Sequence, residues 1–397
     1  MVQGSKGPNP DRDRSRITVP IVVGVTLGLV LLSLAFLSGH LGSTGPSTSG
    51  CSSPDAQVSD PTAPHGMFVL SPPVNAKQAY YADSNQFLVN NSVTCGADFW
   101  VHWNQIDSGP NASVRYNWSS VAQEISPWQE AGKKVNLIFQ TVGYGPNQSW
   151  IPSYVLPQIQ TIQCGQSPLT PLFWKPSYVA LYDAYMRAVV AHFQGDPAIG
   201  YIRFGLGTGG EAFPLYGLQY NSSCDRALNA TGFTVTNWTS YLVSMLEFEH
   251  SLGSSVQLMV ALNSVFPGIR DNVSSTVAAT AASLGIGFGS EGLALSDVHY
   301  NTSGEPACAG GSCRLFEEYA GQVPLEYQTL TASQPNGTGP TGSLTTLLPW
   351  AVAMHTQIFE LYFVDWLTAF DPNYPAYGSY HTAYSTTFQG AAAVVDG

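Results

Sequence analysis

The sequence predicts a single (β/α)8 TIM barrel, an α/β fold in which eight parallel strands close into a cylinder covered by helices. Short apolar runs alternate with longer segments of helical periodicity from residue 65 to residue 397. The runs are almost continuously apolar, which indicates a parallel sheet whose outer face is covered by helices. Eight such units suit the length of a barrel. A doubly wound open sheet is the alternative, although it usually has fewer strands.

The expected strands are short apolar runs, several of which end in a polar or aromatic residue. They are Met67–Ser71, Asp98–Trp103, Val135–Thr141, Ile199–Leu206, Val256–Asn263, Gly285–Gly289, Val323–Gln328 and Ile358–Trp366. The expected helices are Ala76–Leu88, Trp118–Ala131, Ser177–Phe193, Trp238–Leu252, Val273–Leu284, Arg314–Tyr319, Leu344–His355 and Ala383–Val395. The third helix is the clearest, because its aromatic residues recur at three- and four-residue steps and form one apolar stripe.

The segment before the barrel predicts a membrane anchor. Ile17–Leu37 is an apolar run of about 21 residues without a formal charge, enough to cross a bilayer. Residues 1–16 are basic and should stay in the cytoplasm, which leaves the C-terminal domain outside. Residues 38–64 are rich in Ser, Gly and Pro and predict a flexible stalk. We expect a single-pass membrane protein whose extracellular domain spans residues 65–397. A cleaved signal peptide is the alternative, but its apolar run would be shorter.

Composition excludes some classes of partner. The formal net charge is −12, so the chain offers little to neutralise a phosphate backbone, and we expect no nucleic acid partner. Aromatic residues make up 12% of the chain and charged residues 10%, unlike a disordered protein. Because there is no CxxC pair and no HExxH motif, we expect no metal and no cofactor.

Cysteines and glycosylation motifs are consistent with an oxidising, external compartment. Cys308 and Cys313 in CAGGSC are close enough in sequence for a small loop disulfide, whereas the pairing of the other four cysteines stays open. The N-x-S/T motifs make glycosylation possible. They begin at Asn90, Asn111, Asn117, Asn147, Asn221, Asn229, Asn237, Asn272, Asn301 and Asn336.

Two glutamates follow expected strands and are the candidate catalytic residues. Glu211 ends the glycine cluster GLGTGGEAFP after the fourth strand, and Glu326 lies at the end of the seventh in VPLEYQT. Because the reactive groups of such barrels lie at the carboxyl ends of strands, we expect the two to face one another across the mouth. A carboxyl pair of this kind suits acid/base or nucleophilic cleavage of a glycosidic bond. Glu291 in GFGSEG is the competitor for the second catalytic position, and Glu360 is a candidate to pair inside the barrel.

The same glycine cluster also matches the dinucleotide fingerprint GxGxxG. That fingerprint requires a helix that opens at the last glycine. Pro214 and Gly217 follow instead, which argues against a nucleotide-dependent enzyme.

Other residues at the ends of the expected strands would form the walls of a sugar-binding pocket, with aromatic faces for stacking and polar groups for hydroxyls. These candidates are His102, Trp103, Asn104, Tyr144, Asn263, Glu291, Tyr327, Gln328, Asp365 and Trp366.

The motifs GADFWVHWNQID, WQEAGKKVNLIF, GLGTGGEAFP and VPLEYQT resemble the (β/α)8 glycoside hydrolases, especially the family 42 β-galactosidase barrel and the family 14 β-amylases. The resemblance implies that Glu211 is the general acid and Glu326 the nucleophile or base, acting on an oligosaccharide or polysaccharide. Retaining members usually have Asn before the strand-four Glu, where this chain has Gly210. Retention and inversion therefore both stay open, and so does a barrel that binds carbohydrate without cleaving it.

Overall fold

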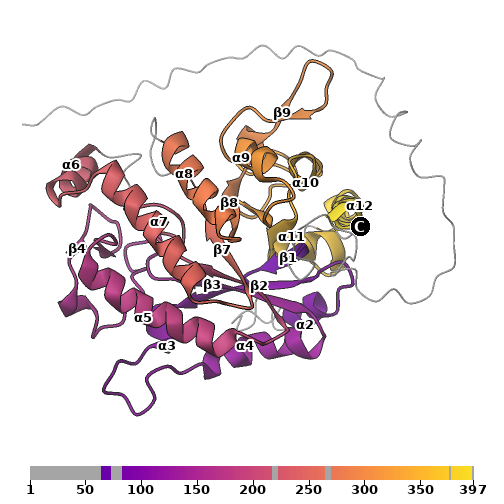
Figure 1. Ribbon diagram of the computed structural model, residues 1–397. Coiled ribbons are helices and arrows are strands. Elements are labelled where there is room, and N and C mark those ends of the chain that lie inside the picture. Colours follow the sequence, from indigo (N-terminus) through magenta and orange to yellow (C-terminus); the bar gives the residue numbers. More distant parts are fainter. Residues whose placement is uncertain (1–63, 73–82, 217–221, 264–269, 375–376, 396–397) are drawn as a thin grey trace, which may run out of the picture. The chain divides into compact units, whose positions relative to one another are not determined.

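Eight parallel strands close into a barrel in chain order, which confirms the expected fold class (Figure 1). The computed structural model describes residues 64–72, 83–216, 222–263, 270–374 and 377–395. The barrel strands are β1 (Gly66–Leu70), β2 (Gly96–His102), β3 (Lys134–Gln140), β6 (Ile199–Phe204), β7 (Gln257–Ala261), β8 (Gly287–Leu293), β11 (Leu325–Thr329) and β12 (Ile358–Tyr362). Closure is made by β1, which pairs with both β2 and β12.

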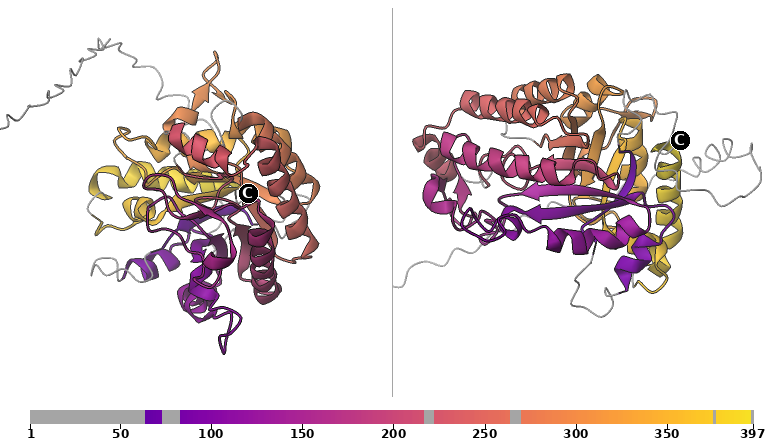
Figure 2. Two further views of the ribbon diagram at one scale, coloured as in Figure 1. Left: turned by 90° about the vertical axis from the view of Figure 1, so that its left-hand side faces the viewer. Right: turned by 60° about the horizontal axis from the view of Figure 1, so that its bottom comes forward.

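Helices surround the strands, as the left view of Figure 2 shows. They are α2 (Ser84–Val89), α3 (Trp103–Ile106), α4 (Ser119–Glu130), α5 (Pro176–Phe193), α6 (Ser222–Ala230), α7 (Val235–Ser251), α8 (Arg270–Ser283), α9 (Ser312–Tyr319), α10 (Leu344–Ala353), α11 (Phe363–Phe370) and α12 (Tyr377–Val395). Short pieces decorate the loops: the pair β4 (Thr161–Ile162) and β5 (Thr170–Pro171), the pair β9 (His299–Tyr300) and β10 (Pro306–Ala307), and the 3₁₀ turns η1 (Leu156–Gln158) and η2 (Leu295–Asp297). Each expected helix has a counterpart, although part of Ala76–Leu88 lies outside the described residues.

The aromatic stripe of α5 packs against the barrel wall, and Trp103 packs against this stripe. Trp103 is fully buried in α3, and its ring stacks on Tyr185 at 5.1 Å between centroids. Its indole nitrogen donates to Asp107 Oδ2. Trp103 was therefore wrongly predicted as a pocket residue. Strand β2 ends one residue earlier, and the chain turns into a helix that carries the indole into the core.

The eighth strand is shorter than predicted. It ends at Tyr362, and Asp365 and Trp366 belong to α11. The Asp365 carboxylate accepts hydrogen bonds from the backbone and hydroxyl of Ser333, and Trp366 packs against Phe388 of α12. Both residues hold the barrel's outer layer together. Their predicted place at a strand end, facing sugar, is wrong.

The expectation of a single-pass membrane protein is corrected. Within the described part of the chain, no helix combines the length and apolar character needed to cross a bilayer. The chain divides into Met1–Ser47 and Thr48–Gly397, and the predicted tail, anchor and stalk up to residue 63 lie outside the described residues. The structure therefore does not support the predicted anchoring or the extracellular placement derived from it.

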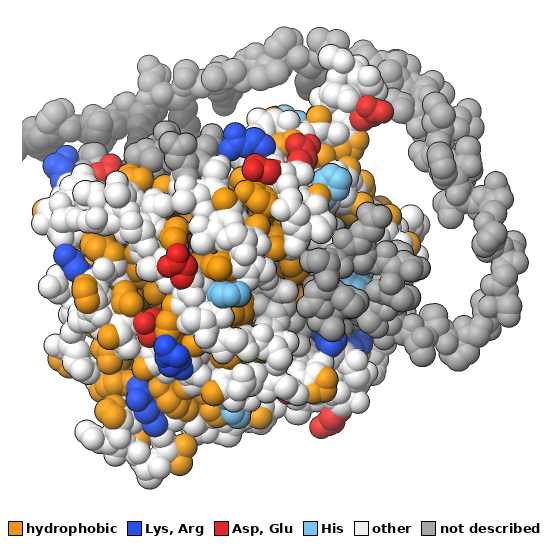
Figure 3. Space-filling model, viewed as in Figure 1, with side chains coloured by type: hydrophobic (Ala, Val, Ile, Leu, Met, Phe, Trp, Pro, Cys, Tyr) orange, Lys and Arg blue, Asp and Glu red, His pale blue; other side chains and the backbone are white. Residues whose placement is uncertain are grey.

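The disulfide predicted within CAGGSC is present between Cys308 and Cys313. A second disulfide joins Cys164 to Cys224, and Cys95 is disulfide-bonded as well. On the surface, charged side chains are few and dispersed, as one face of the molecule shows (Figure 3).

Candidate active site

The glycine cluster turns the chain back over the mouth of the barrel and presents Glu211. Gly209 and Gly210 have φ angles of +77° and +86°, which residues other than glycine rarely adopt. A β-carbon at Gly209 would lie 2.1 Å from the Tyr144 hydroxyl. The turn closes where the Thr208 amide donates to the Phe213 carbonyl at 2.8 Å. No helix opens at Gly210, so the loop lacks the geometry of the dinucleotide fingerprint.

Glu211 is buried at this turn, with 5% of its surface exposed. The Tyr144 hydroxyl donates a hydrogen bond to its Oε1 atom. Burial raises the pKa of Glu211 well above its usual range, and the neighbouring charge of Glu291 raises it further. Contacts with Tyr144 and Asn263 lower the pKa in part. Burial therefore favours the protonated, neutral form of the Glu211 carboxyl group.

Glu291 shares the pocket with Glu211 and lies where β8 bulges. Ser290 pairs with Tyr327 of β11, but the next paired residue, Leu293, faces Thr329, so β8 has one extra residue at this point. Such bulges re-aim side chains near active sites. The Glu291 carboxylate forms an ion pair with Arg203, whose Nη2 atom lies 2.7 Å from Oε1. Burial raises the pKa of Glu291 to about 7, and the guanidinium of Arg203 opposes that rise.

Glu326 does not reach the pocket, so its predicted position opposite Glu211 is wrong. Its side chain is fully buried inside the barrel, where Oε2 lies 2.8 Å from Nη1 of Arg203. Gly289 leaves room for it, since a β-carbon there would lie 1.7 Å from Oε2. Gln328, two residues further along β11, is the one that lines the pocket. Its buried Oε1 atom has no hydrogen-bond partner among the described residues, as expected of a polar group that would bond to a ligand.

Arg203 also binds Glu360, so three carboxylates surround one guanidinium in the barrel interior. Nη1 and Nη2 of Arg203 donate to the two oxygens of Glu360 at 3.0 and 3.1 Å. The Tyr201 hydroxyl lies within hydrogen-bonding distance of both Glu360 and Asp98. Glu360 thus pairs within the barrel, as the sequence suggested. This polar interior anchors Arg203 and, through it, Glu291.

The pocket above this network has a volume of about 530 Å³, within the usual range for ligand sites. Aromatic rings form much of its wall. Its lining residues are Trp100, Gln140, Gly143, Tyr144, Gln148, Trp150, Gly209, Glu211, Phe213, Tyr216, Asn263, Glu291, Gly292, Gln328, Leu330 and Tyr362. The structure therefore brings together five of the predicted residues, namely Glu211, Tyr144, Asn263, Glu291 and Gln328.

The other predicted wall residues lie elsewhere. The His102 ring stacks on Trp150 at 3.8 Å between ring centroids, and burial lowers the pKa of His102 to about 4. Asn104 is exposed, and its backbone N–H donates to the backbone carbonyl of Trp150. Tyr327 points away from the pocket and packs on Phe316. These residues support the wall or neighbouring structure rather than line the pocket.

Sequence reasoning missed several lining residues, including Trp100 and Tyr362. A signal existed for Trp100: Asp98, Trp100 and His102 alternate along β2, and alternate residues of a strand share a face. Arg203 was missed because it stands inside an apolar run. An isolated charge in such a run is a sign of a partner in the barrel interior.

Among the described residues, no group of three or more His, Cys, Asp or Glu side chains is placed to hold a metal ion.

The barrel is similar to solved structures of glycoside hydrolases. No protein-family model matches the sequence, and no curated protein matches it. The catalytic domain of a β-amylase from Paenibacillus polymyxa is 12% identical with a TM-score of 0.53, covering 81% of this chain and 98% of that one. A β-galactosidase from Marinomonas ef1 is 12% identical with a TM-score of 0.45, covering 75% and 53% of the two chains. Xylanase 10B from Thermotoga maritima is 11% identical with a TM-score of 0.45, covering 82% and 96%. The expected resemblance to the β-amylase barrel is thus confirmed at the level of the fold.

Proposed function

We propose that the protein is a glycoside hydrolase in which Glu211 is the general acid and Glu291 the base or nucleophile. One observation carries the proposal: two carboxyl groups with different partners face one pocket walled by aromatic rings. The aromatic faces suit the apolar faces of sugar rings, and the amides of Gln140, Asn263 and Gln328 suit their hydroxyls. Support for the substrate class comes from the fold that the chain shares with β-amylase.

The two environments assign the two roles. Cleavage needs one protonated carboxyl group beside the leaving oxygen and one ionised carboxylate that attacks the sugar or activates water. Glu211 has no cation pair among the described residues, and burial favours its neutral form. Glu291 has the guanidinium of Arg203 beside it, which favours its ionised form. Glu211 would therefore donate the proton and Glu291 would act on the anomeric carbon or on the water.

The test is the pair of substitutions Glu211→Gln and Glu291→Gln, assayed on a panel of aryl glycosides and neutral oligosaccharides. Each should lower kcat by a factor of about 10²–10⁴, the range for a catalytic acid or base. Glu130→Gln is the control, since Glu130 is exposed at the end of α4. Circular dichroism and thermal unfolding would establish that the variants fold. Wild-type turnover in both folded variants would refute the assignment.

A second candidate is a barrel that binds carbohydrate without cleaving it. The observation in its favour is that Gln328, an amide, is the residue of β11 that lines the pocket, in place of a carboxylate. The same assay decides between the two. A wild-type protein that binds oligosaccharides by calorimetry and leaves them intact after prolonged incubation would establish the second candidate.

A further inference from the structure

A second cavity adjoins the pocket of Glu211 and Glu291. Its volume is about 290 Å³, and it shares Phe213, Asn263 and Gly292 with the larger pocket. The remaining lining residues are Ser290, Asp297, Gly310, Gly311, Ser312, Cys313, Tyr327 and Trp350. We call this cavity the side pocket. Because the two cavities share three lining residues, they lie side by side.

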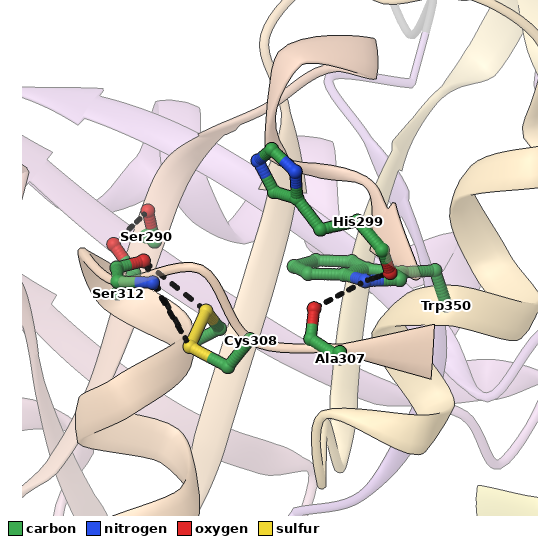
Figure 4. Close-up of a disulfide and its surroundings, with 8 residues drawn as sticks. Ser290, His299, Ala307, Cys308, Ser312 and Trp350 are labelled. Atoms are coloured by element: carbon green, nitrogen blue, oxygen red, sulfur yellow. Dashed lines mark hydrogen bonds between the residues drawn. A yellow bond between two sulfur atoms is a disulfide. The ribbon is translucent and has the colours of Figure 1, made fainter. Parts of the chain in front are cut away.

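The wall of the side pocket is held by covalent and hydrogen bonds (Figure 4). The disulfide between Cys308 and Cys313 closes the loop that carries Gly310 and Gly311. The indole nitrogen of Trp350 donates to the carbonyls of His299 and Ala307 at 3.2 and 3.3 Å, which ties the β9–β10 hairpin to α10. The loop leading from β10 to α9 is thereby anchored at both ends. Because this wall is already anchored, little conformational entropy would be lost in ordering it when a ligand binds.

A row of polar side chains joins the side pocket to the candidate catalytic residues. The Ser312 hydroxyl donates to Ser290 at 2.9 Å, and the Ser290 hydroxyl donates to Oδ1 of Asn263 at 3.1 Å. The same Oδ1 accepts the backbone amide of Glu291 at 2.8 Å. Asn263 also contacts Glu211 and lowers its pKa. A ligand bound at Ser312 and Ser290 would therefore contact the residues that position Asn263.

The lining identifies the chemistry of the ligand. Hydroxyls, an amide and the Asp297 carboxylate accept or donate hydrogen bonds, and Tyr327 and Trp350 add aromatic surface. The described lining residues of both cavities include no Lys or Arg, whereas Glu211, Glu291 and Asp297 are acidic. The carboxylates of Glu291 and Asp297 would repel an anionic sugar, while a neutral sugar can hydrogen-bond to the polar lining.

We propose that the side pocket is an accessory subsite for one neutral saccharide unit of the chain bound at Glu211 and Glu291. The proposal rests on the proposed function for the identity of the ligand. It predicts that the protein prefers oligosaccharides that reach the side pocket over single sugars and aryl glycosides. It also predicts that uronic acid and sulfated oligosaccharides bind more weakly than neutral ones.

The experiment is calorimetric binding of neutral series of one to five units, based on glucose, galactose, mannose and xylose, together with an oligogalacturonide. The Glu211→Gln variant serves as the background, so that ligands stay intact. Ser312→Leu fills the side pocket, and Ser283→Leu is the matched control on the exposed end of α8. We expect affinity to rise at least tenfold between the single sugar and a longer member of one neutral series. Ser312→Leu should remove most of that gain, and Ser283→Leu should preserve it.

Three results would overturn the subsite. They are affinity that does not depend on length, a folded Ser312→Leu variant that keeps the full length preference, and stronger binding of the oligogalacturonide. Absence of binding by every neutral series would overturn it as well. Hydrolysis by the wild-type protein is scored separately. If the length preference and its loss in Ser312→Leu appear but no wild-type cleavage does, the subsite stands and the catalytic proposal falls.

Discussion

The Nη2 atom of Arg203 lies 2.7 Å from Oε1 of Glu291, deep in a barrel where both side chains are shielded from solvent. Arg203 reaches Glu291 from the neighbouring interior layer, where it also binds Glu326 and Glu360. This contact gives the two carboxyl groups of the pocket different electrostatic environments. Glu291 is paired with a cation, whereas Glu211 receives a neutral hydroxyl hydrogen bond from Tyr144.

The pH dependence of kcat/KM should follow from this difference. Activity requires ionised Glu291 and protonated Glu211, so kcat/KM should rise through about pH 7 and fall at higher pH as Glu211 loses its proton. The two apparent pKa values belong to the pair, because the groups interact. Since the charge of Glu360 raises the pKa of Glu291, Glu360→Gln should move the rising limb to lower pH. The measurement is a pH profile with Glu130→Gln as control, and an unmoved limb would contradict the proposed role of Glu291.

Tyr144→Phe should move the other limb. The Tyr144 hydroxyl lowers the pKa of Glu211, so its removal should raise that pKa and shift the falling limb of kcat/KM to higher pH. The ring that lines the pocket is kept, which limits the effect on substrate affinity. Tyr300→Phe, at a tyrosine with 53% exposure, is the control. A change confined to the rising limb would show that Tyr144 acts on Glu291 instead.

Glu326→Gln separates the pair seen in the pocket from the pair expected from the sequence. Glu326 is fully buried and does not line the pocket, and Arg203 keeps two other carboxylates when Glu326 is neutral. We expect kcat to fall by less than about tenfold, against about 10²–10⁴ for Glu291→Gln. Steady-state kinetics on the same substrate provide the comparison. The reverse order of effects would restore Glu326 as the second catalytic residue.

Glu249 makes a prediction about stability. It is fully buried in α7, and neither carboxylate oxygen has a hydrogen-bond partner among the described residues. Burial raises its pKa well above the usual value of 4.5. The folded state therefore binds this proton more tightly than the unfolded state, so stability should fall as pH rises above about 4.5 toward the raised pKa. The loss ends once the folded carboxyl group ionises.

Replacing that carboxyl group with an apolar side chain of similar length removes the loss. Glu249→Met should stabilise the protein at neutral pH by about 1–3 kcal/mol, the cost of an unsatisfied buried polar group. Glu247→Met, on the exposed face of the same helix, is the control. Urea unfolding at pH 4 and pH 7.5 measures both variants. A gain of equal size at the two pH values would show that the titration of Glu249 does not contribute.

Local patterns in the sequence were enough to predict the barrel and to place Glu211 in its pocket. The alternation of apolar runs and helical periods depends on neighbours along the chain, so the strands could be placed to within a few residues. The glycine cluster before Glu211 likewise predicts a sharp turn at a strand end, and the six-residue loop of Cys308 and Cys313 was short enough to predict its disulfide. Local sequence patterns therefore predicted the barrel and one of the two carboxyl groups that line the pocket.

Which second carboxyl group faces Glu211 was decided only by the tertiary structure. Glu326 and Glu291 both stand near the end of an expected strand, but their height in the barrel depends on how β8 and β11 pair. The bulge in that pairing brings Glu291 and Gln328 to the pocket, and Glu326 lies in the layer beneath, against Arg203. Likewise, the early end of β12 sends Asp365 and Trp366 into the outer layer. The pairing register of strands and the positions of their ends depend on contacts between segments distant in sequence. A local pattern of neighbouring residues therefore does not predict them.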